Sequence, residues 1–403
     1  MMKQVCELEH NLNGSYTEKF KKVAETFKKN FAQGWETSGA AVTIYHKNEL
    51  VLDLHGGFSD KEENKLWDKD TLTVVFSVSK SIGALCVALL IDKGLAEYDD
   101  KVVKYWPEFG QNGKENVTIR HIMSHRAGLA YFEDTISLAD ANDHVKIAKI
   151  IESTKPNWVP GEKSGYHAIT YGWLVDQLIR KVDPLNRGIS QFFKEEIGVP
   201  HGINFHLGLN EDLEKHVSNL VAPSIAYRIK EILHDPRVLI VIAIINAQTK
   251  SSIAHKVKNN FDWMKVDQKE ISFNRPEVHS VEQTAALGIT KSSDLGKLFA
   301  LVLNGKIISK SLVNTFITPE ITNEVDVVFK APMAKGHGFL YEKHPTKKDK
   351  WLVGHPGFGG STIMMDVEDE LVISYVTNGL KSGMGELTRT YRVLRNAAIK
   401  CAV

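Results

Sequence analysis

The sequence is poor in cysteine. Its three cysteines are Cys6, Cys86 and Cys401, which are far apart and odd in number. They therefore predict neither a disulfide framework nor a zinc site. No group of histidine, cysteine and aspartate has the spacing of metal ligands, so we expect no metal and no other cofactor.

An excess of charge of one sign is also lacking. The chain has 50 basic and 49 acidic residues and a net charge of +1. This balance gives no electrostatic case for nucleic acid or for an anionic membrane surface. The first thirty residues lack arginine and an apolar leader, which predicts a cytoplasmic protein. We expect a small-molecule substrate, and the sequence leaves the oligomeric state open.

Long hydrophobic runs are absent as well. The most apolar run, residues 238–245, is too short to span a bilayer, so we expect no membrane span. The run has two interpretations. The simpler one is a buried helix or strand, and the other is an apolar wall or lid over a substrate pocket.

The chain shows strand-like patterns towards both ends and helical patterns between them. Two apolar runs, Ala40–Tyr45 and Leu50–Leu54, predict a β-hairpin whose second strand is ended by Gly56 and Gly57. Further short strands are expected at 338–342, 350–354, 361–366 and 371–377, and helices at 20–31, 118–125, 292–303 and 385–400.

This order predicts an α/β (α+β) fold. One antiparallel sheet, flanked by helices, would be built from residues 1–75 and 325–403, and residues 76–324 would form an inserted all-helical domain. No internal repeat or low-complexity segment interrupts it.

The most hydrophobic helix pattern follows Ser77 and Lys80. Apolar residues from Ile82 to Leu90 leave almost no polar face, and Gly94 ends the pattern. Ser77 and Lys80 are three residues apart, so both lie on one face of the helix. A lysine desolvated there could lose its proton and serve as base for a serine nucleophile. A capped core helix explains the same spacing equally well.

Three other features are candidates for a site. Tyr166 follows Pro160-Gly161, and a tyrosine beside a lysine can relay a proton, although it is more often a core aromatic. The segment Gly354-His355-Pro356-Gly357-Phe358-Gly359-Gly360 lies between two expected strands, where free N–H groups could stabilise an oxyanion, or it is a plain hairpin turn. His125 ends a short helix, where a histidine usually bonds locally.

Taken in this order, the motifs resemble the serine beta-lactamase-related family, which holds class C beta-lactamases, penicillin-binding carboxypeptidases, related esterases and animal beta-lactamase-like proteins. Ser77-Val78-Ser79-Lys80 matches its Ser-x-x-Lys box, and Tyr166 its second box. His355-Pro356-Gly357 occupies the place of its Lys-Thr-Gly strand, and residues 118–129 look like its helix-turn signature. The resemblance covers residues 39 to 379, a single unit.

The resemblance implies a site between the sheet and the helical domain. Ser77 would be the acylated nucleophile, Lys80 its proton acceptor and Tyr166 a partner in proton transfer. The backbone N–H groups of Ser77 and Phe358 would form the oxyanion hole. His355, Gly357 and His167 would contact the substrate.

Two departures from the family pattern point to the substrate. The family's Tyr-x-Asn is Tyr166-His167-Ala168 here, and a histidine replaces lysine at 355, which weakens the attraction for a substrate carboxylate. We therefore expect a serine hydrolase that acts on small carboxylic esters through an acyl-enzyme. The alternatives are a beta-lactamase or peptidase-type amide hydrolase, and a non-catalytic scaffold or filament subunit.

Overall fold

The computed structural model describes residues 2–7, 9–246, 249–267 and 270–402. In this part of the chain, ten strands form one antiparallel sheet to which both ends of the chain contribute, as expected. Its order is β1-β2-β4-β3-β13-β12-β11-β10-β9, with β5 paired to β4. The strands are β1 (Met2–Glu7), β2 (Leu12–Thr17), β3 (Gly39–His46), β4 (Glu49–Asp60), β5 (Lys65–Leu66), β9 (Lys335–Gly336), β10 (Phe339–Lys343), β11 (Trp351–Pro356), β12 (Thr362–Asp366) and β13 (Leu371–Thr377). A small second sheet pairs β6 (Thr73–Val74), β8 (Ile289–Thr290) and β7 (Phe205–His206).

The predicted hairpin is confirmed as β3 and β4, but its second strand does not end at Gly56. β4 continues to Asp60, and Gly56 and Gly57 pair with Ala40 and Gly39 of β3. These glycines serve close packing: a Cβ on Gly57 would lie 2.0 Å from the Ser38 carbonyl oxygen. The N-terminal hairpin β1–β2 lies outside the sequence-based expectations.

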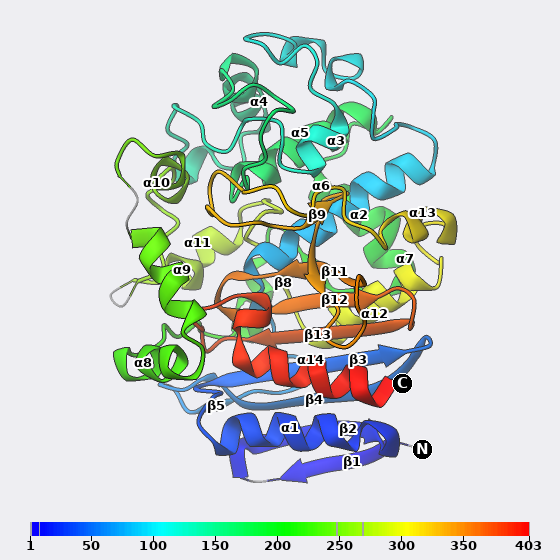
Figure 1. Ribbon diagram of the computed structural model, residues 1–403, viewed down its shortest axis with the longest axis vertical. Coiled ribbons are helices and arrows are strands. Elements are labelled where there is room, and N and C mark those ends of the chain that lie inside the picture. Colours follow the sequence, from blue (N-terminus) through cyan, green and yellow to red (C-terminus); the bar gives the residue numbers. More distant parts are fainter. Residues whose placement is uncertain (1, 8, 247–248, 268–269, 403) are drawn as a thin grey trace.

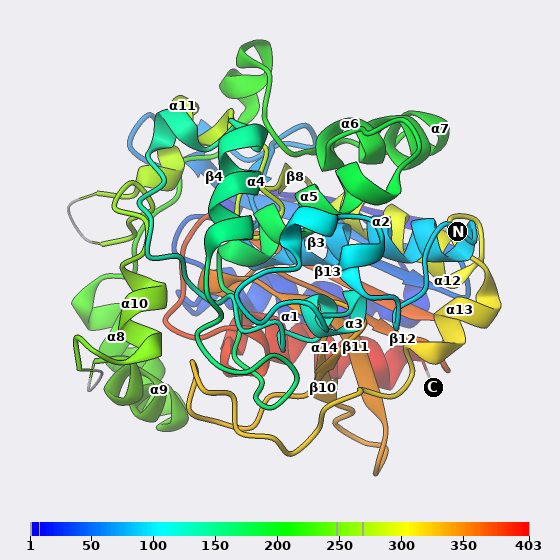
Figure 2. The ribbon, with the colours of Figure 1, turned by 90° about the horizontal axis from the view of Figure 1, so that it is seen from above.

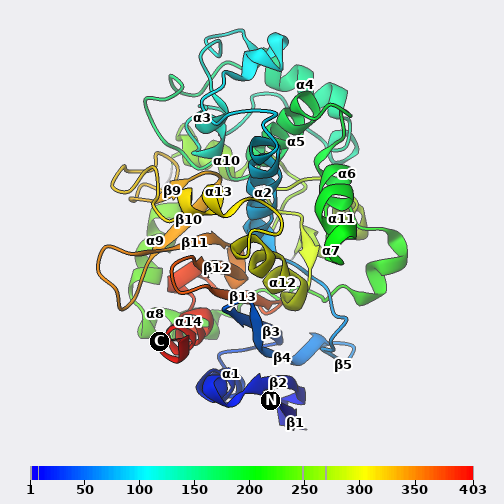
Figure 3. The same cartoon turned by 90° about the vertical axis from the view of Figure 1, so that its right-hand side faces the viewer.

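Helices cover both faces of the sheet (Figures 1 and 3). Alternate side chains of β3 and β13, such as Val42 and Ile373, pack under α1 and α14 in one apolar cluster. Those that point the other way, such as Val372, join a larger cluster with α2 and α12. The helices are α1 (Lys21–Ala32), α2 (Ser79–Asp92), α3 (Ile119–Met123), α4 (His144–Ser153), α5 (Thr170–Val182), α6 (Ile189–Phe193), α7 (Val199–His201), α8 (Ile225–His234), α9 (Arg237–Asn246), α10 (Ile253–Lys258), α11 (Pro276–His279), α12 (Ser292–Leu303), α13 (Lys310–Thr315) and α14 (Arg389–Ala402).

The hydrophobic helix predicted after Ser77 is α2, and it lies between the sheet and the helical layer (Figures 2 and 3). Every residue from Ser79 to Leu90 is buried, which follows from the lack of a polar face. The helix ends before Gly94, whose φ of +71° favours glycine. Its N-terminus meets β11, so sequence segments almost 280 residues apart meet at one place.

The apolar run 238–245 forms most of α9. The buried interpretation is wrong for two of its residues, because Leu239 and Ile240 are 51% and 58% exposed, while Val238 is buried. The side chains of Val241, Ile244 and Ile245 lie outside the described residues. Among the described residues, no helix combines the length and the apolar character needed to cross a bilayer.

Candidate active site

Ser77 lies in a tight turn at the start of α2. The residues Phe76–Val78 form one 3₁₀ turn. Phe76 has a φ of +48°, which residues other than glycine rarely adopt. Such a conformation costs about 1–3 kcal/mol and persists where the surroundings impose it. Here the Phe76 ring packs against the rings of Phe273 and Phe358, with centroids 4.8 Å and 5.5 Å away. The turn places the Ser77 hydroxyl 3.3 Å from the Lys80 Nζ.

Lys80 is fully buried and its amine has only neutral partners. Nζ donates to the carbonyl oxygens of Ala168 and Ala285, each at 2.7 Å. Among the described residues, no carboxylate forms an ion pair with it. Burial therefore lowers the pKa of Lys80 well below its ordinary value, because the charged form loses its hydration without compensation.

The two carbonyls also determine where the lone pair of Lys80 points when the amine is neutral. A neutral amine has two N–H donors and one lone pair, and the two carbonyls of Ala168 and Ala285 take both donors. In this neutral form the lone pair is left for the Ser77 hydroxyl, 3.3 Å away, and the serine proton has an acceptor beside it. The charged amine instead donates its third N–H to the Ser77 oxygen.

Tyr166 and His355 complete the polar part of the site. The Tyr166 hydroxyl lies 3.4 Å from His355 Nε2 and close enough to Ser77 for the serine to oppose part of the effect of burial on the Tyr166 pKa. Burial raises the pKa of Tyr166 above its ordinary value, so the phenol keeps its proton at neutral pH. Burial, and then the nearby Lys80, lower the pKa of His355 to about 3. His355 is neutral, and because its Nδ1 faces the Pro356 carbonyl at 2.7 Å, the proton sits there and Nε2 is an acceptor.

The geometry does not support the expected contact between His167 and substrate. The ring is completely buried, its Nε2 accepts the Leu129 N–H at 3.0 Å, and its Nδ1 faces the Gly165 carbonyl at 2.6 Å. Burial lowers the pKa of His167 to about 4. His125 is also internal, and its Nδ1 accepts the His167 backbone N–H. Both rings thus support the loop that carries Tyr166.

The glycine-rich segment lies directly on the Ser77 turn. A Cβ on Gly357 would be 2.5 Å from the Val75 carbonyl oxygen and 3.3 Å from a methyl group of Val78, so only glycine fits. The next residues, Phe358–Gly360, form a 3₁₀ turn at the end of β11. The expected pair Ser77 and Phe358 is therefore brought to one place, and the Phe358 side chain is 48% exposed there.

One part of the site has no sequence signal that we recognised. The Phe329 ring packs on Tyr166, with centroids 5.3 Å apart. Its loop is fixed by Asp326, whose carboxylate accepts the N–H groups of Val328 and Phe329 and pairs with Lys335. Asp326 and Lys335 are both fully buried. A lysine and an aspartate nine residues apart in the chain would have been the only clue.

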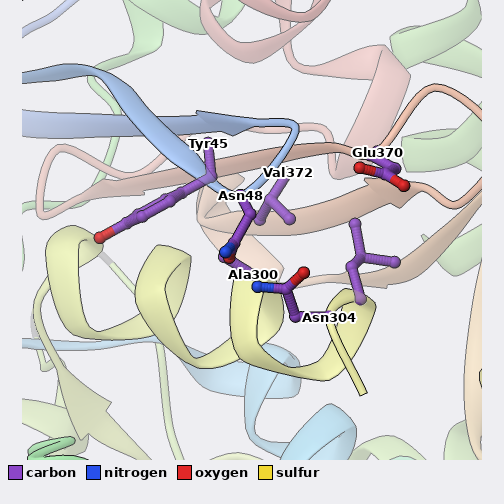
Figure 4. A pocket seen from close by; sticks show the side chains of 7 residues that line it. Tyr45, Asn48, Ala300, Asn304, Glu370 and Val372 are labelled. Atoms are coloured by element: carbon purple, nitrogen blue, oxygen red, sulfur yellow. The ribbon is translucent and has the colours of Figure 1, made fainter. Parts of the chain in front are cut away.

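Two hollows lie away from Ser77. One lies between the β3–β4 turn and α12 (Figure 4) and has a volume of about 10 Å³, enough for one water molecule. The other, of about 250 Å³, is lined by residues of α4 and α5, among them Trp173, Asp176 and Arg180. Neither hollow includes a residue of the predicted site.

A further group, His344, Asp366 and Asp369, brings its ligand atoms within 4.8 Å of one another. His344 Nδ1 accepts the Lys347 N–H, and its Nε2 lies 3.2 Å from Asp366 Oδ2. The Lys347 ammonium binds Asp369. His344 Nε2 and Asp366 Oδ2 are buried and form no hydrogen bond within the described part of the chain.

The comparisons with known proteins agree on one protein family. A model of the family described as "Beta-lactamase" matches residues 27–398. The chain is 27% identical to an esterase/beta-lactamase, LipL, of Mycobacterium tuberculosis, over 96% of this chain and 88% of that protein. Among solved structures, a penicillin-binding protein homologue from Caulobacter crescentus superposes with a TM-score of 0.80 at 26% identity, covering 97% of this chain and 99% of that one. A family VIII carboxylesterase gives a TM-score of 0.79, also at 26% identity, with the same coverage.

Proposed function

The chain belongs to the beta-lactamase family and is a serine hydrolase, and from this premise we propose that it hydrolyses small carboxylic esters through an acyl-enzyme on Ser77. The observation that carries the proposal is the environment of Lys80. A buried amine that is held by two carbonyls and lies 3.3 Å from the serine hydroxyl is arranged to act as a base once it is neutral.

Acylation would begin at the Ser77–Lys80 contact. The Ser77 oxygen attacks the ester carbonyl carbon while its proton passes to the Lys80 amine. The oxyanion would be held by the N–H groups of Ser77 and Phe358, at the positive end of α2. Tyr166 touches Ser77 and retains its phenol proton, so it is placed to protonate the leaving alkoxide and to be reprotonated from Lys80.

Deacylation would reuse the same groups in reverse. Water takes the place of the departed alcohol, Lys80 with Tyr166 accepts its proton, and Ser77 leaves with a proton returned. His355 would hold the Tyr166 hydroxyl rather than act as the base, because the Nδ1 of its ring faces a carbonyl and not a carboxylate.

The substrate preference rests on what surrounds these groups. The exposed Phe358 ring, which packs on the buried Phe76 ring, offers an apolar surface beside Ser77. A neutral His355 gives little attraction for a carboxylate, and Ala168 offers no side-chain amide to a substrate amide. An unpaired amide in a buried site costs about 1–3 kcal/mol, so esters are favoured over beta-lactams and peptides by about tenfold or more.

The test compares p-nitrophenyl butyrate with nitrocefin and labels the enzyme with a fluorophosphonate. We expect ester turnover to exceed nitrocefin turnover, and both labelling and turnover to disappear in Ser77→Ala. Ser81→Ala is the matched control, because it removes a hydroxyl one turn along α2 that donates only to the Val78 carbonyl. Labelling that persists in Ser77→Ala, or equal specificity for nitrocefin, would contradict the proposal.

A further inference from the structure

Gln283 is a completely buried side chain that joins two segments of the candidate active site. Its Nε2 donates to the carbonyl of Ile169, which is 114 residues away in the chain, at 2.6 Å. Its Oε1 accepts the N–H groups of Ala285 and Ala286 at 2.8 Å and 3.0 Å. A side-chain amide carries donor and acceptor at one end, so it can bond to both segments at once. Gln283 thus ties the segment before α5 to the segment before β8.

The Ala285 carbonyl, one of the two acceptors of Lys80, is held directly by Gln283. This carbonyl and the Ala286 N–H belong to one planar peptide group, in which they point to opposite sides. The hydrogen bond from the Ala286 N–H to Gln283 Oε1 therefore fixes the direction of the carbonyl, which accepts from Lys80 Nζ at 2.7 Å on the other side.

The other acceptor of the amine, the Ala168 carbonyl, is held through the next residue. It accepts from Nζ at 2.7 Å, and the following carbonyl, that of Ile169, accepts from Gln283. The amide fits only because residue 172 of α5 is a glycine: a Cβ on Gly172 would lie 2.7 Å from Gln283 Cδ. Gln283 therefore sets the separation of the two carbonyls that hold the amine.

We propose that Gln283 is a positioning residue, whose amide fixes the two carbonyls around Lys80 and so keeps the amine against Ser77. The role rests on the proposed function, in which Lys80 is the base for Ser77. Among the described residues, no hydrogen bond joins Gln283 to either of them, so it acts through the backbone. A displacement of about 1 Å at a reacting group can cost about 10²-fold in rate.

The rate at which a fluorophosphonate labels Ser77, measured across a range of pH, tests this role. Attack requires the neutral Lys80 amine, so the midpoint of the profile reports the protonation of that amine. The other titratable side chains near the amine are neutral at pH 7, because burial raises the pKa of the tyrosines and lowers that of the histidines: Tyr166, Tyr171, His125, His167 and His355.

Gln283→Met has a similar length and volume but makes no hydrogen bond. We expect its maximal labelling rate to fall by about 10–100-fold, because the amine is no longer held against Ser77. The midpoint should move to lower pH, because the charged amine loses its carbonyl acceptors while the apolar side chain keeps water out. For p-nitrophenyl butyrate, kcat should fall with the labelling rate, and KM should stay within about twofold.

Two further variants make the comparison specific. Gln283→Glu keeps an acceptor for the N–H groups of Ala285 and Ala286, loses the donor to Ile169 and adds a negative charge. It should label several-fold more slowly than the parent, with its midpoint at higher pH. Gln177→Met is the matched control, because Gln177 is also buried and its Nε2 donates to a backbone carbonyl at 2.9 Å, away from the site. Its profile should equal that of the parent.

The outcomes separate the positioning role from the proposed function. A Gln283→Met profile with the rate and midpoint of the parent would overturn the positioning role alone. So would a loss of labelled protein without a shift of the midpoint, because Gln283 would then serve stability only. Should this variant fail to fold, a parent-like profile of Gln283→Glu would overturn the role. If the parent takes the label but turns over no ester, the ester function is wrong, and the profiles still decide the role of Gln283. A parent that takes no label on Ser77 would contradict both.

Discussion

Lys80 at the start of α2 and Lys335 in β9 are both completely buried, yet their environments are opposite. Lys335 pairs with the buried carboxylate of Asp326, which opposes the lowering of the pKa of Lys335 by burial. Lys80 has two carbonyls and a hydroxyl, and nothing opposes the effect of burial. Burial alone thus favours a neutral amine that can serve as a base, whereas burial beside a carboxylate gives an ion pair that holds a loop.

The largest expected effect separates the two lysines by activity. Lys80→Ala should lower the rate of acylation by about 10²–10⁴-fold, the usual range for the loss of acid–base catalysis. Its cost in the free energy of unfolding should stay near 1–3 kcal/mol, because only neutral carbonyls lose a partner. Single-turnover acylation and urea unfolding measure the two quantities. Normal acylation in this variant would show that Lys80 is not the base, and the two lysines would then differ in environment but not in function.

The second effect is expected in stability. Asp326→Asn keeps an acceptor for the N–H groups of Val328 and Phe329 but leaves Lys335 without a counter-charge. Removing one partner of a buried ion pair costs about 3–5 kcal/mol of unfolding free energy. Acylation by the folded fraction should fall less than in Lys80→Ala. If the unfolding free energy does not change, the pair is not needed to hold this loop.

The sequence predicted the first lysine and not the second for a physical reason. Ser77 and Lys80 are one helical turn apart, so local geometry alone brings them together, and the apolar stripe after them shows that the turn is buried. Asp326 and Lys335 meet across an irregular loop for which no periodicity exists. The division at residues 75/76 and 324/325 stays a prediction, although the sheet does draw its strands from both ends of the chain.

Two sequence-based predictions about the fold were wrong for similar reasons. Two successive glycines are typical of a strand end, but Gly56 and Gly57 lie within β4, where Leu12 and Ser38 leave no room for a Cβ. For α9, the apolar composition predicted burial, whereas Leu239 and Ile240 face outward. An apolar composition indicates that burial would be favourable for a segment. It does not say whether other residues of the same chain bury that segment.

The third effect is a difference in pH dependence. The folded-state pKa of Lys80 lies below the value of about 10.5 in the unfolded chain, so the unfolded chain binds more protons between the two values. Stability from this group therefore rises with pH through that window, by at most about 1.4 kcal/mol per pH unit. The unfolding free energy of the parent, minus that of Lys80→Ala, should rise as the pH is raised towards 10.5. A flat difference would show that Lys80 stays charged in the folded protein.

The smallest effect is expected at His355. This residue is the other buried side chain of the site that could act as a base, so its variant tests whether it shares the role of Lys80. His355 accepts from the Tyr166 hydroxyl at 3.4 Å, a long hydrogen bond, and donates to a carbonyl. With a pKa of about 3, its neutral ring does not readily take up a second proton at neutral pH. His355→Ala should therefore act mainly through KM, with less than about a tenfold loss in kcat. Tyr166→Phe, which removes the hydroxyl that touches Ser77, should instead lose about 10²–10⁴-fold in kcat. Single-turnover acylation of the two variants beside Lys80→Ala decides the question. If His355→Ala abolishes acylation while Lys80→Ala acylates normally, histidine is the base, and the lone pair of Lys80 has no part in the reaction.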